Sequence, residues 1–121
     1  MHELAITEEI VDAVRARCAP GERVTRVVLE IGKLSSVLPD AVRFCFDLCC
    51  EGTPLHGAAL AIEEPPGRAR CRRCDGEVLL ERPFGRCACG STELDWISGE
   101  ELRIRSIELE PIELGPTMEV D

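Results

Sequence analysis

The feature that most constrains the fold is two short cysteine motifs separated by twelve residues. The motif CRRC supplies Cys71 and Cys74, and the motif CAC supplies Cys87 and Cys89. Zn(II) is bound tetrahedrally by four thiolates from two such turns, and four thiolates leave no open coordination position. The motifs therefore predict a structural Zn(II) site. The second pair has one intervening residue where two are usual, so incomplete ligation by Cys87 or a redox thiol pair are the alternatives.

The cysteine motifs interrupt the pattern of a small domain that contains helices and strands. Amphipathic stretches predict helices at 4–18 and 39–51, and β-branched stretches predict strands at 23–31, 58–63 and 101–109. The apolar positions of the last strand change phase near Ser106, which indicates a β-bulge. We expect an α+β fold, in which two helices pack on a three-stranded sheet in two layers and a zinc-ribbon-like module is inserted.

These patterns divide the chain into two domains. Residues 1–67 and 96–121 are expected to form an α/β domain, and residues 68–95 an inserted zinc-binding domain. The segments Pro65-Pro66-Gly67 and Ile97-Ser98-Gly99 are expected to act as hinges, and Trp96 to pack where the insert rejoins the sheet. The insert is too small for a hydrophobic core of its own, so zinc binding, typically about 10–16 kcal/mol, would supply its folding energy.

Composition and charge exclude several classes of function. No apolar run approaches the roughly 20 residues of a membrane span, and no charged and apolar leader opens the chain, so we expect a cytoplasmic protein without a membrane partner. The formal net charge is −9. This charge argues against general nucleic-acid binding and favours a basic protein partner or a cation.

Arginines cluster around the cysteine motifs, at positions 68, 70, 72, 73, 82 and 86. Zinc ribbons often contact nucleic acid through such residues. The alternatives are a solvated face and a surface that docks to an acidic protein. Because Phe84 is the only nearby aromatic residue, a platform for base stacking is not expected.

The other cysteines and the second histidine have simpler explanations. Cys45 and Cys49 lie on the apolar stripe of the second helix, and with Cys18 we expect them to be core residues rather than a second metal site. Redox sensitivity is the alternative. Cys50 falls off the stripe and is expected to be exposed, and His56 is expected on a surface turn.

A histidine at position 2 is not needed for an amphipathic helix. The Met1 amine, the His2 backbone nitrogen and the imidazole Nδ1 can close adjoining chelate rings on one metal. A deprotonated amide nitrogen favours Ni(II) or Cu(II) over zinc. The arrangement requires a free Met1 amine, which a bulky second residue favours. A fourth position would remain for Glu3, for Asp40 or for a group from a partner. His2 as the polar leader of a helix is the alternative.

Four blocks of sequence recur in the order of a known family. They are MHELAI, VTRVVLEIGKLSSVLPDAVRFCFD, GTPLHGAALAIEEPPG and SGEELRIRSIELE. The chain resembles the HypA/HybF family, the nickel metallochaperones of [NiFe]-hydrogenase maturation, from Met1 to about Glu110. Such a protein is a carrier and not an enzyme, and the sequence contains no nucleophile–base constellation that would indicate catalysis. A zinc-ribbon module that binds nucleic acid or protein is the alternative function.

The resemblance implies the cargo, the cofactor and the partners. Nickel would be carried at the Met-His-Glu terminus, through Met1, His2 and Glu3, and Zn²⁺ would be structural. The expected partners are a HypB-type GTPase and the [NiFe]-hydrogenase large-subunit precursor, with urease maturation proteins in some organisms. Some relatives offer a histidine after the zinc module as a further nickel ligand. The chain reads DWISGEE there, so a fourth ligand must come from elsewhere.

Overall fold

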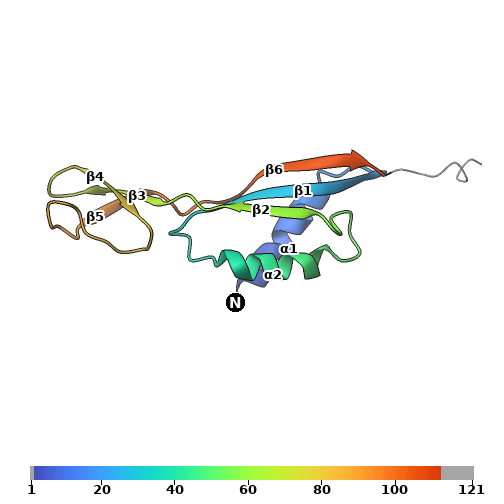
Figure 1. The fold of residues 1–121 in the computed structure, drawn as a ribbon, viewed down its shortest axis with the longest axis horizontal. Helices are drawn as coiled ribbons and strands as arrows, with labels where there is room; N and C mark the ends of the chain where they lie inside the picture. The colour runs from blue at the N-terminus through green and yellow to red at the C-terminus, as the bar shows by residue number, and fades with distance from the viewer. Residues whose placement is uncertain (1, 113–121) are drawn as a thin grey trace, which may run out of the picture.

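A computed structural model describes residues 2–112 of the chain. Along most of its length the molecule has two layers, a sheet and two helices, and a narrow second sheet extends from one end (Figure 1). The first sheet and its helices comprise α1 (His2–Arg15), β1 (Glu22–Ile31), α2 (Pro39–Cys50), β2 (Ala59–Glu63) and β6 (Leu102–Pro111). The second sheet comprises β3 (Gly67–Cys71), β4 (Glu77–Leu80) and β5 (Leu94–Ser98).

The first sheet has the order β2-β1-β6, with β1 parallel to β2 and antiparallel to β6. Alternate side chains of β1 are buried, including Val27, Leu29 and Ile31, because a half-buried strand points every second residue toward the core. The β1–β6 register shifts at two places, between Val24 and Arg26 and between Val28 and Leu29, and at the second Val28 and Leu29 pair with Ser106 and Ile104. This irregularity lies beside Ser106, where the change of phase in the sequence predicts a bulge.

Both helices cover the same face of this sheet (Figure 1). Val11 and Val14 of α1 and Val42 and Phe46 of α2 are buried in one core with the apolar side chains of β1. Pro39 opens α2, where a fixed φ and a missing N–H cost nothing. The predicted two-layer arrangement of two helices on a three-stranded sheet is therefore confirmed.

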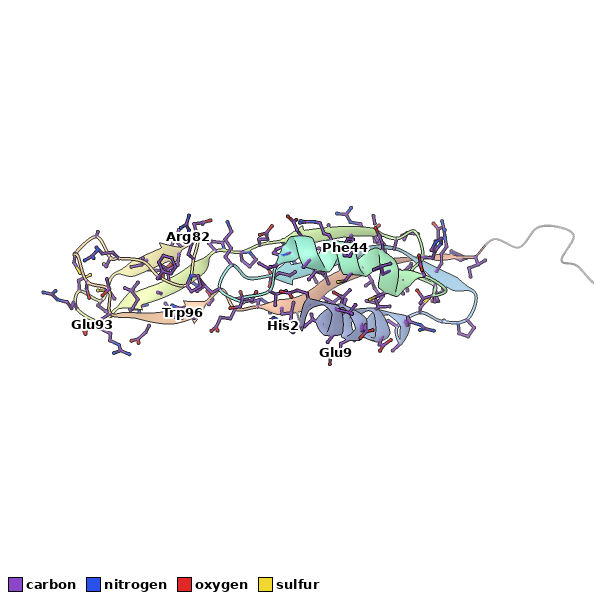
Figure 2. The ribbon with its side chains drawn as sticks, turned by 90° about the horizontal axis from the view of Figure 1, so that it is seen from below. His2, Glu9, Phe44, Arg82, Glu93 and Trp96 are labelled. Carbon is purple, nitrogen blue, oxygen red and sulfur yellow. The ribbon has the colours of Figure 1, made fainter. Side chains whose placement is uncertain are left out.

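The second sheet and its loops form what we call the cysteine module, residues 67–98. Its strand order is β4-β3-β5, and both pairings are antiparallel. Trp96 pairs with Ala69 of β3, so it lies within this module (Figure 2), where its side chain is 41% exposed. It does not pack where the insert rejoins the first sheet, as the sequence suggested. Residues 96–98 belong to the second sheet because β5 continues pairing to Ser98.

A neck of closely packed backbone joins the two sheets, and we define it by Leu34 and three glycines, Gly32, Gly67 and Gly99. The loop after β1 sends Leu34 into the small core of the cysteine module, where it is 2% exposed. Its N–H donates to the Gly99 carbonyl at 2.8 Å. A Cβ on Gly67 would overlap Leu34, and a Cβ on Gly99 would lie 2.5 Å from the Gly67 Cα. The two segments expected as hinges are thus packed around one leucine.

Cys50 is the clearest correction to the sequence-based expectations. It is 2% exposed, although its place off the predicted stripe suggested an exposed thiol. It follows Phe46 by four residues, so the helix places both side chains on the same buried face. Cys18 and Cys49 pack against the core as expected, and His56 lies exposed in a turn after α2. In residues 2–112, no helix is both long and apolar enough to cross a membrane.

Candidate metal centres

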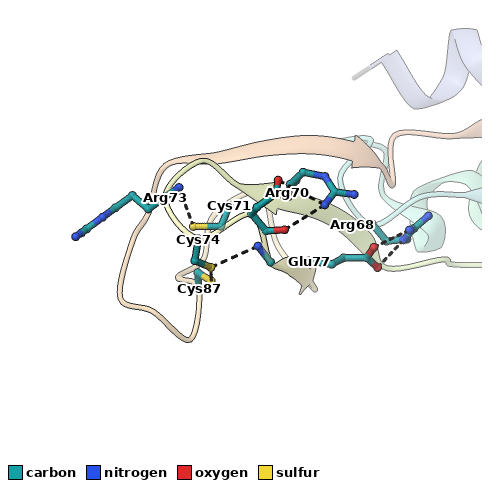
Figure 3. A network of polar contacts seen from close by, with 9 residues as sticks. Arg68, Arg70, Cys71, Arg73, Cys74, Glu77 and Cys87 are labelled. Atoms are coloured by element: carbon teal, nitrogen blue, oxygen red, sulfur yellow. Dashed lines mark hydrogen bonds and ion pairs between the residues drawn. The ribbon is translucent and has the colours of Figure 1, made fainter.

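The four cysteines of the two motifs converge at the end of the cysteine module that lies farthest from the helices (Figure 3). Their sulfur atoms lie within 4.8 Å of one another. The Cys71 and Cys89 sulfurs are 3.6 Å apart, and those of Cys74 and Cys87 are 3.5 Å apart. Four thiolates at the usual Zn–S bond length of about 2.3 Å stand about 3.8 Å apart in a tetrahedron. The cluster therefore fits Zn(II).

Local turns aim the four sulfurs at one point. After Cys71 the chain folds back, and the N–H groups of Arg73 and Gly76 donate to the Cys71 and Cys74 sulfurs, each at 3.4 Å. Asp75 makes the turn with φ of 63°. Such N–H···S bonds stabilise a thiolate over a thiol, which is what a metal ligand requires.

The shorter CAC motif reaches the same point by a different turn. Gly90 has φ of 96° and donates its N–H to the Cys87 carbonyl at 2.8 Å. The Cys87 N–H donates in turn to the Ser91 carbonyl at 2.9 Å. A residue with a side chain is strained at such a φ, so Gly90 allows a C-x-C pair to present both sulfurs.

The pKa values of the Cys71 and Cys74 thiols are shifted in opposite directions. Backbone hydrogen bonds from Cys74 and then Arg73 lower the pKa of Cys71 to about 6, against its burial. The Gly76 N–H lowers the pKa of Cys74, but hydrogen bonds with Cys87 and Cys89 raise it to about 12. Four neighbouring thiols cannot all ionise alone, whereas a divalent cation offsets their repulsion and permits four thiolates.

Much of the positive charge of the module is neutralised within it. Arg68 forms a double hydrogen bond with the Glu77 carboxylate at 2.8 and 2.9 Å. Arg72 pairs with Asp95 at 2.8 Å, and the Arg70 guanidinium donates to the Asp75 carbonyl at 3.1 Å. These contacts form across strands and turns of the module. Arg86 also donates to the Gly90 carbonyl at 2.6 Å, so four of the six arginines are held in structural contacts.

The amino-terminal residues lie in the first turn of α1, on the side that faces the cysteine module (Figure 2). The His2 side chain is 60% exposed, and its Nε2 lies 3.9 Å from the Glu3 carboxylate. Glu3 is buried, and its carboxylate accepts a hydrogen bond from the Leu38 N–H at 3.1 Å. Met1 lies outside the described residues.

The environment of Glu3 strongly favours its charged form. A hydrogen bond with the terminal ammonium is the largest cause that lowers the pKa of Glu3 to about 2, and the Leu38 N–H is the next. Glu3 thus ties the start of α1 to the loop that precedes α2. This bond cannot be read from the local sequence, because Glu3 and Leu38 are 35 positions apart and a carboxylate in a first helical turn ordinarily faces solvent.

Among the described residues, Asp40 does not form a ligand set with His2 and Glu3. Its side chain is exposed and its Oδ1 accepts a hydrogen bond from Arg43 at 2.6 Å. Among the described residues 2–112, one group of three or more histidine, cysteine or acidic side chains has all its ligand atoms within 4.8 Å of one another. That group is the four module cysteines. His2, Glu3 and Asp40 do not form such a group among themselves.

The fold and the cluster together define a class of protein. A two-layer α+β domain carries an inserted zinc-ribbon-like module with four converging thiols, as expected for a metal-binding protein. The chain belongs to the HypA family, because the family model described as "Hydrogenase/urease nickel incorporation, metallochaperone, hypA" matches residues 1–109. The resemblance inferred from the sequence is confirmed. The family consists of metallochaperones and not of enzymes.

Curated relatives and a solved structure support this assignment. Hydrogenase maturation factor HypA from Nostoc sp. is 57% identical over 112 residues, which is 93% of this chain and 98% of the relative. The Geotalea uraniireducens protein of the same name is 47% identical over 111 residues, 91% of this chain and all of the relative. The solution structure of the Ni metallochaperone HypA from Helicobacter pylori has a TM-score of 0.57 at 23% identity. It covers 89% of this chain and 97% of that chain, and shows the same fold.

Proposed function

We propose that this chain binds Ni(II) at its amino terminus and delivers it to a partner during [NiFe]-hydrogenase maturation. The observation that carries the proposal is the exposed His2 imidazole in the first turn of α1, beside a Glu3 that is anchored to the loop before α2. Membership of a nickel-incorporation family indicates that the metal is nickel. The His2 imidazole is exposed, so a partner can reach it. The backbone of the same turn is fixed by the hydrogen bond between Glu3 and Leu38.

The position of His2 at the start of a helix leaves its backbone nitrogen available. The first four N–H groups of an α-helix have no intrahelical partner. The amide nitrogens of His2 and Glu3 can therefore lose their protons to a metal without breaking a helical hydrogen bond. With the terminal amine and the imidazole they complete a planar nitrogen field, which favours Ni(II) over Zn(II). The buried Glu3 carboxylate serves to anchor the turn, so its backbone nitrogen is the better donor.

Such a site is exchangeable, which is what a carrier requires. Protonation of the amine and the imidazole displaces the metal, so acid should weaken binding. Because His2 is exposed, a ligand from a partner can enter the coordination sphere before the protein ligands leave.

We propose that the four module cysteines hold a structural Zn(II), with Cys71, Cys74, Cys87 and Cys89 as its ligands. Sulfur separations of 3.5 and 3.6 Å and the N–H donors around them support this assignment. A complete set of thiolates leaves zinc no open position, so its contribution is to stability. The expected partners are a HypB-type GTPase and the [NiFe]-hydrogenase large-subunit precursor, with urease maturation proteins as further clients. The cytoplasmic location stays a prediction.

The neck provides a physical link between the two metal centres. Leu34 is buried in the cysteine module, and four residues later the Leu38 N–H donates to Glu3 beside His2. A change in the position of the module would therefore act on the loop that anchors the nickel turn. Unchanged zinc-site X-ray absorption spectra on nickel loading would count against such a link.

The decisive experiment is a calorimetric titration of Ni(II) into zinc-loaded protein with its native terminus. Two variants serve as comparisons, a Gly-Ser extension ahead of Met1 and His2→Ala. We expect one nickel per chain for the native protein and loss of that site in both variants. His56→Ala is the matched control, since it removes the other histidine from an exposed turn. If the extended protein or His2→Ala binds nickel as the native protein does, the site lies elsewhere and the proposal is wrong.

A further inference from the structure

Helix α2 carries a second apolar face that nothing in the described structure covers. Phe44 is 73% exposed and Leu48 is 56% exposed, and the two are four residues apart on the helix. Ala41, three residues before Phe44, and the exposed Leu38 ahead of the helix extend the same line. We call these four residues the helix ridge. Figure 2 views the molecule from the side of the helices and labels Phe44 on α2.

The ridge is not a part of the core that happens to be poorly packed. The buried side chains of α2 are Val42, Phe46 and Cys50, and they lie on the face that meets the sheet. A surface helix needs one apolar stripe to pack on its domain, and α2 has that stripe and a second one. Large apolar side chains grouped on a surface mark an interaction site.

Acidic side chains border the ridge on both sides. Asp40 and Asp47 lie on α2 and Glu51 follows its last residue, while Glu8 and Asp12 of α1 line a hollow that Cys49 also lines. Against these five carboxylates stand Arg43, which pairs with Asp40, and Arg15. Among the described residues no ion pair engages Glu8, Asp12, Asp47 or Glu51. The border therefore has an excess of unpaired negative charge.

We infer that the helix ridge is a docking surface for a basic amphipathic helix of a partner protein. A helix with apolar residues at i, i+3, i+4 and i+7 can lay them against Phe44 and Leu48, and lysines or arginines beside that stripe meet the acidic border. The inference goes beyond the proposed nickel function and stands on the surface alone. It gives the carrier a second contact, separate from the metal, by which it chooses a partner.

Charge decides between this occupant and the alternatives. A second copy of the chain, docked ridge to ridge, would bring two acidic borders together, and like charges across an interface cost affinity. An anionic membrane surface would be repelled for the same reason. The hollow of the cysteine module beside Phe84 and Trp96 carries Arg86 on its lining and would select an acidic partner instead.

The test measures binding of a labelled model peptide to the full-length, zinc-loaded protein by fluorescence anisotropy. The probe is an amphipathic helix of about 14 residues, four turns, built from leucine and lysine; its twin carries glutamate in place of lysine. Phe44→Glu and Leu48→Glu remove the apolar contacts and add negative charge. Phe84→Glu is the matched control, since Phe84 is 72% exposed on the cysteine module. Circular dichroism and the nickel titration establish that each variant is folded and retains its metal sites.

We expect the lysine peptide to bind the native protein and the glutamate peptide not to bind. Phe44→Glu and Leu48→Glu should each weaken binding at least about tenfold, although both strengthen the long-range attraction. Phe84→Glu should leave it unchanged. The inference is overturned if the lysine peptide does not bind, if the α2 variants lose less than this factor, or if Phe84→Glu weakens binding equally. It is also overturned if sedimentation shows a native dimer that Phe44→Glu dissociates.

Discussion

The neck can be tested by shortening one side chain, in the variant Leu34→Ala. Leu34 is 2% exposed, and truncation of a buried leucine costs roughly 2–5 kcal/mol, depending on how far the neighbours fill the gap. Here two of the neighbours, Gly67 and Gly99, have no side chains that could move inward. We therefore expect a loss in the upper half of that range, about 4 kcal/mol of unfolding free energy. For a chain of 121 residues this lowers the melting temperature by roughly 15 °C.

Thermal and urea unfolding of the zinc-loaded protein would measure this loss. Trp96 is the single tryptophan of the chain and lies in the cysteine module, so its fluorescence reports on the module while far-UV circular dichroism reports on the helices. Leu34→Met keeps the volume and should cost less than about 1.5 kcal/mol. Leu38→Ala, at an exposed position of the same loop, should change stability by less than about 0.5 kcal/mol. A loss under about 1 kcal/mol for Leu34→Ala would refute the argument that this leucine holds the two sheets together.

Three further predictions follow from the two centres and the neck. Removal of zinc with a chelator should unfold the cysteine module, because its core is too small without the metal; a shift of Trp96 emission would show this, and re-addition of zinc should reverse it. Glu3 has a native pKa of about 2 against an ordinary value of 4.5, so its charged form stabilises the fold fully above pH 4.5, and this contribution is lost as pH falls toward 2. In urea melts between pH 6 and 2, Glu3→Gln should be less stable than the native protein at pH 6, and the difference should vanish near pH 2; a constant difference would contradict the assignment. Gly32→Ala should disrupt the neck, because its Cβ would overlap the Gly99 carbonyl, whereas Gly57→Ala meets no atom within 4 Å and should affect stability only through its backbone angle.

The sequence was most informative where periodicity and spacing act locally. The alternation of Val27, Leu29 and Ile31 marks a strand with one buried face, and Pro39 marks the start of α2. The spacing of the four cysteines predicts that their sulfurs converge, and this prediction does not depend on the conformation of the turns between them. The strand and the helix start are decided by neighbours within a few residues, and the cysteine site by two short motifs within one segment of 19 residues, so no knowledge of the distant sheet was required.

Features that depend on distant residues could not be predicted in this way. Glu3 bonds to Leu38, and Leu34 packs against glycines that lie 33 and 65 positions further along the chain. Glycines in loops ordinarily indicate turns, so nothing in the local sequence showed that Gly67 and Gly99 are required for close packing. Trp96 was misplaced for a related reason, since only strand pairing assigns β5 to the second sheet.

The order of strands along the chain couples zinc to the distant sheet through folding entropy. Strand β6 completes the first sheet against β1, but the whole cysteine module lies between β2 and β6 in sequence. Without metal, the 38 residues from 64 to 101 would be a flexible loop, whose closure opposes sheet formation by about 3 kcal/mol. With zinc bound, the same segment would be a folded unit whose two ends lie side by side at the neck. The entropy of loop closure would then already be lost when β6 pairs with β1. Through the proposed zinc site, metal supply would therefore control how readily the first sheet forms, although that sheet does not contact the ion.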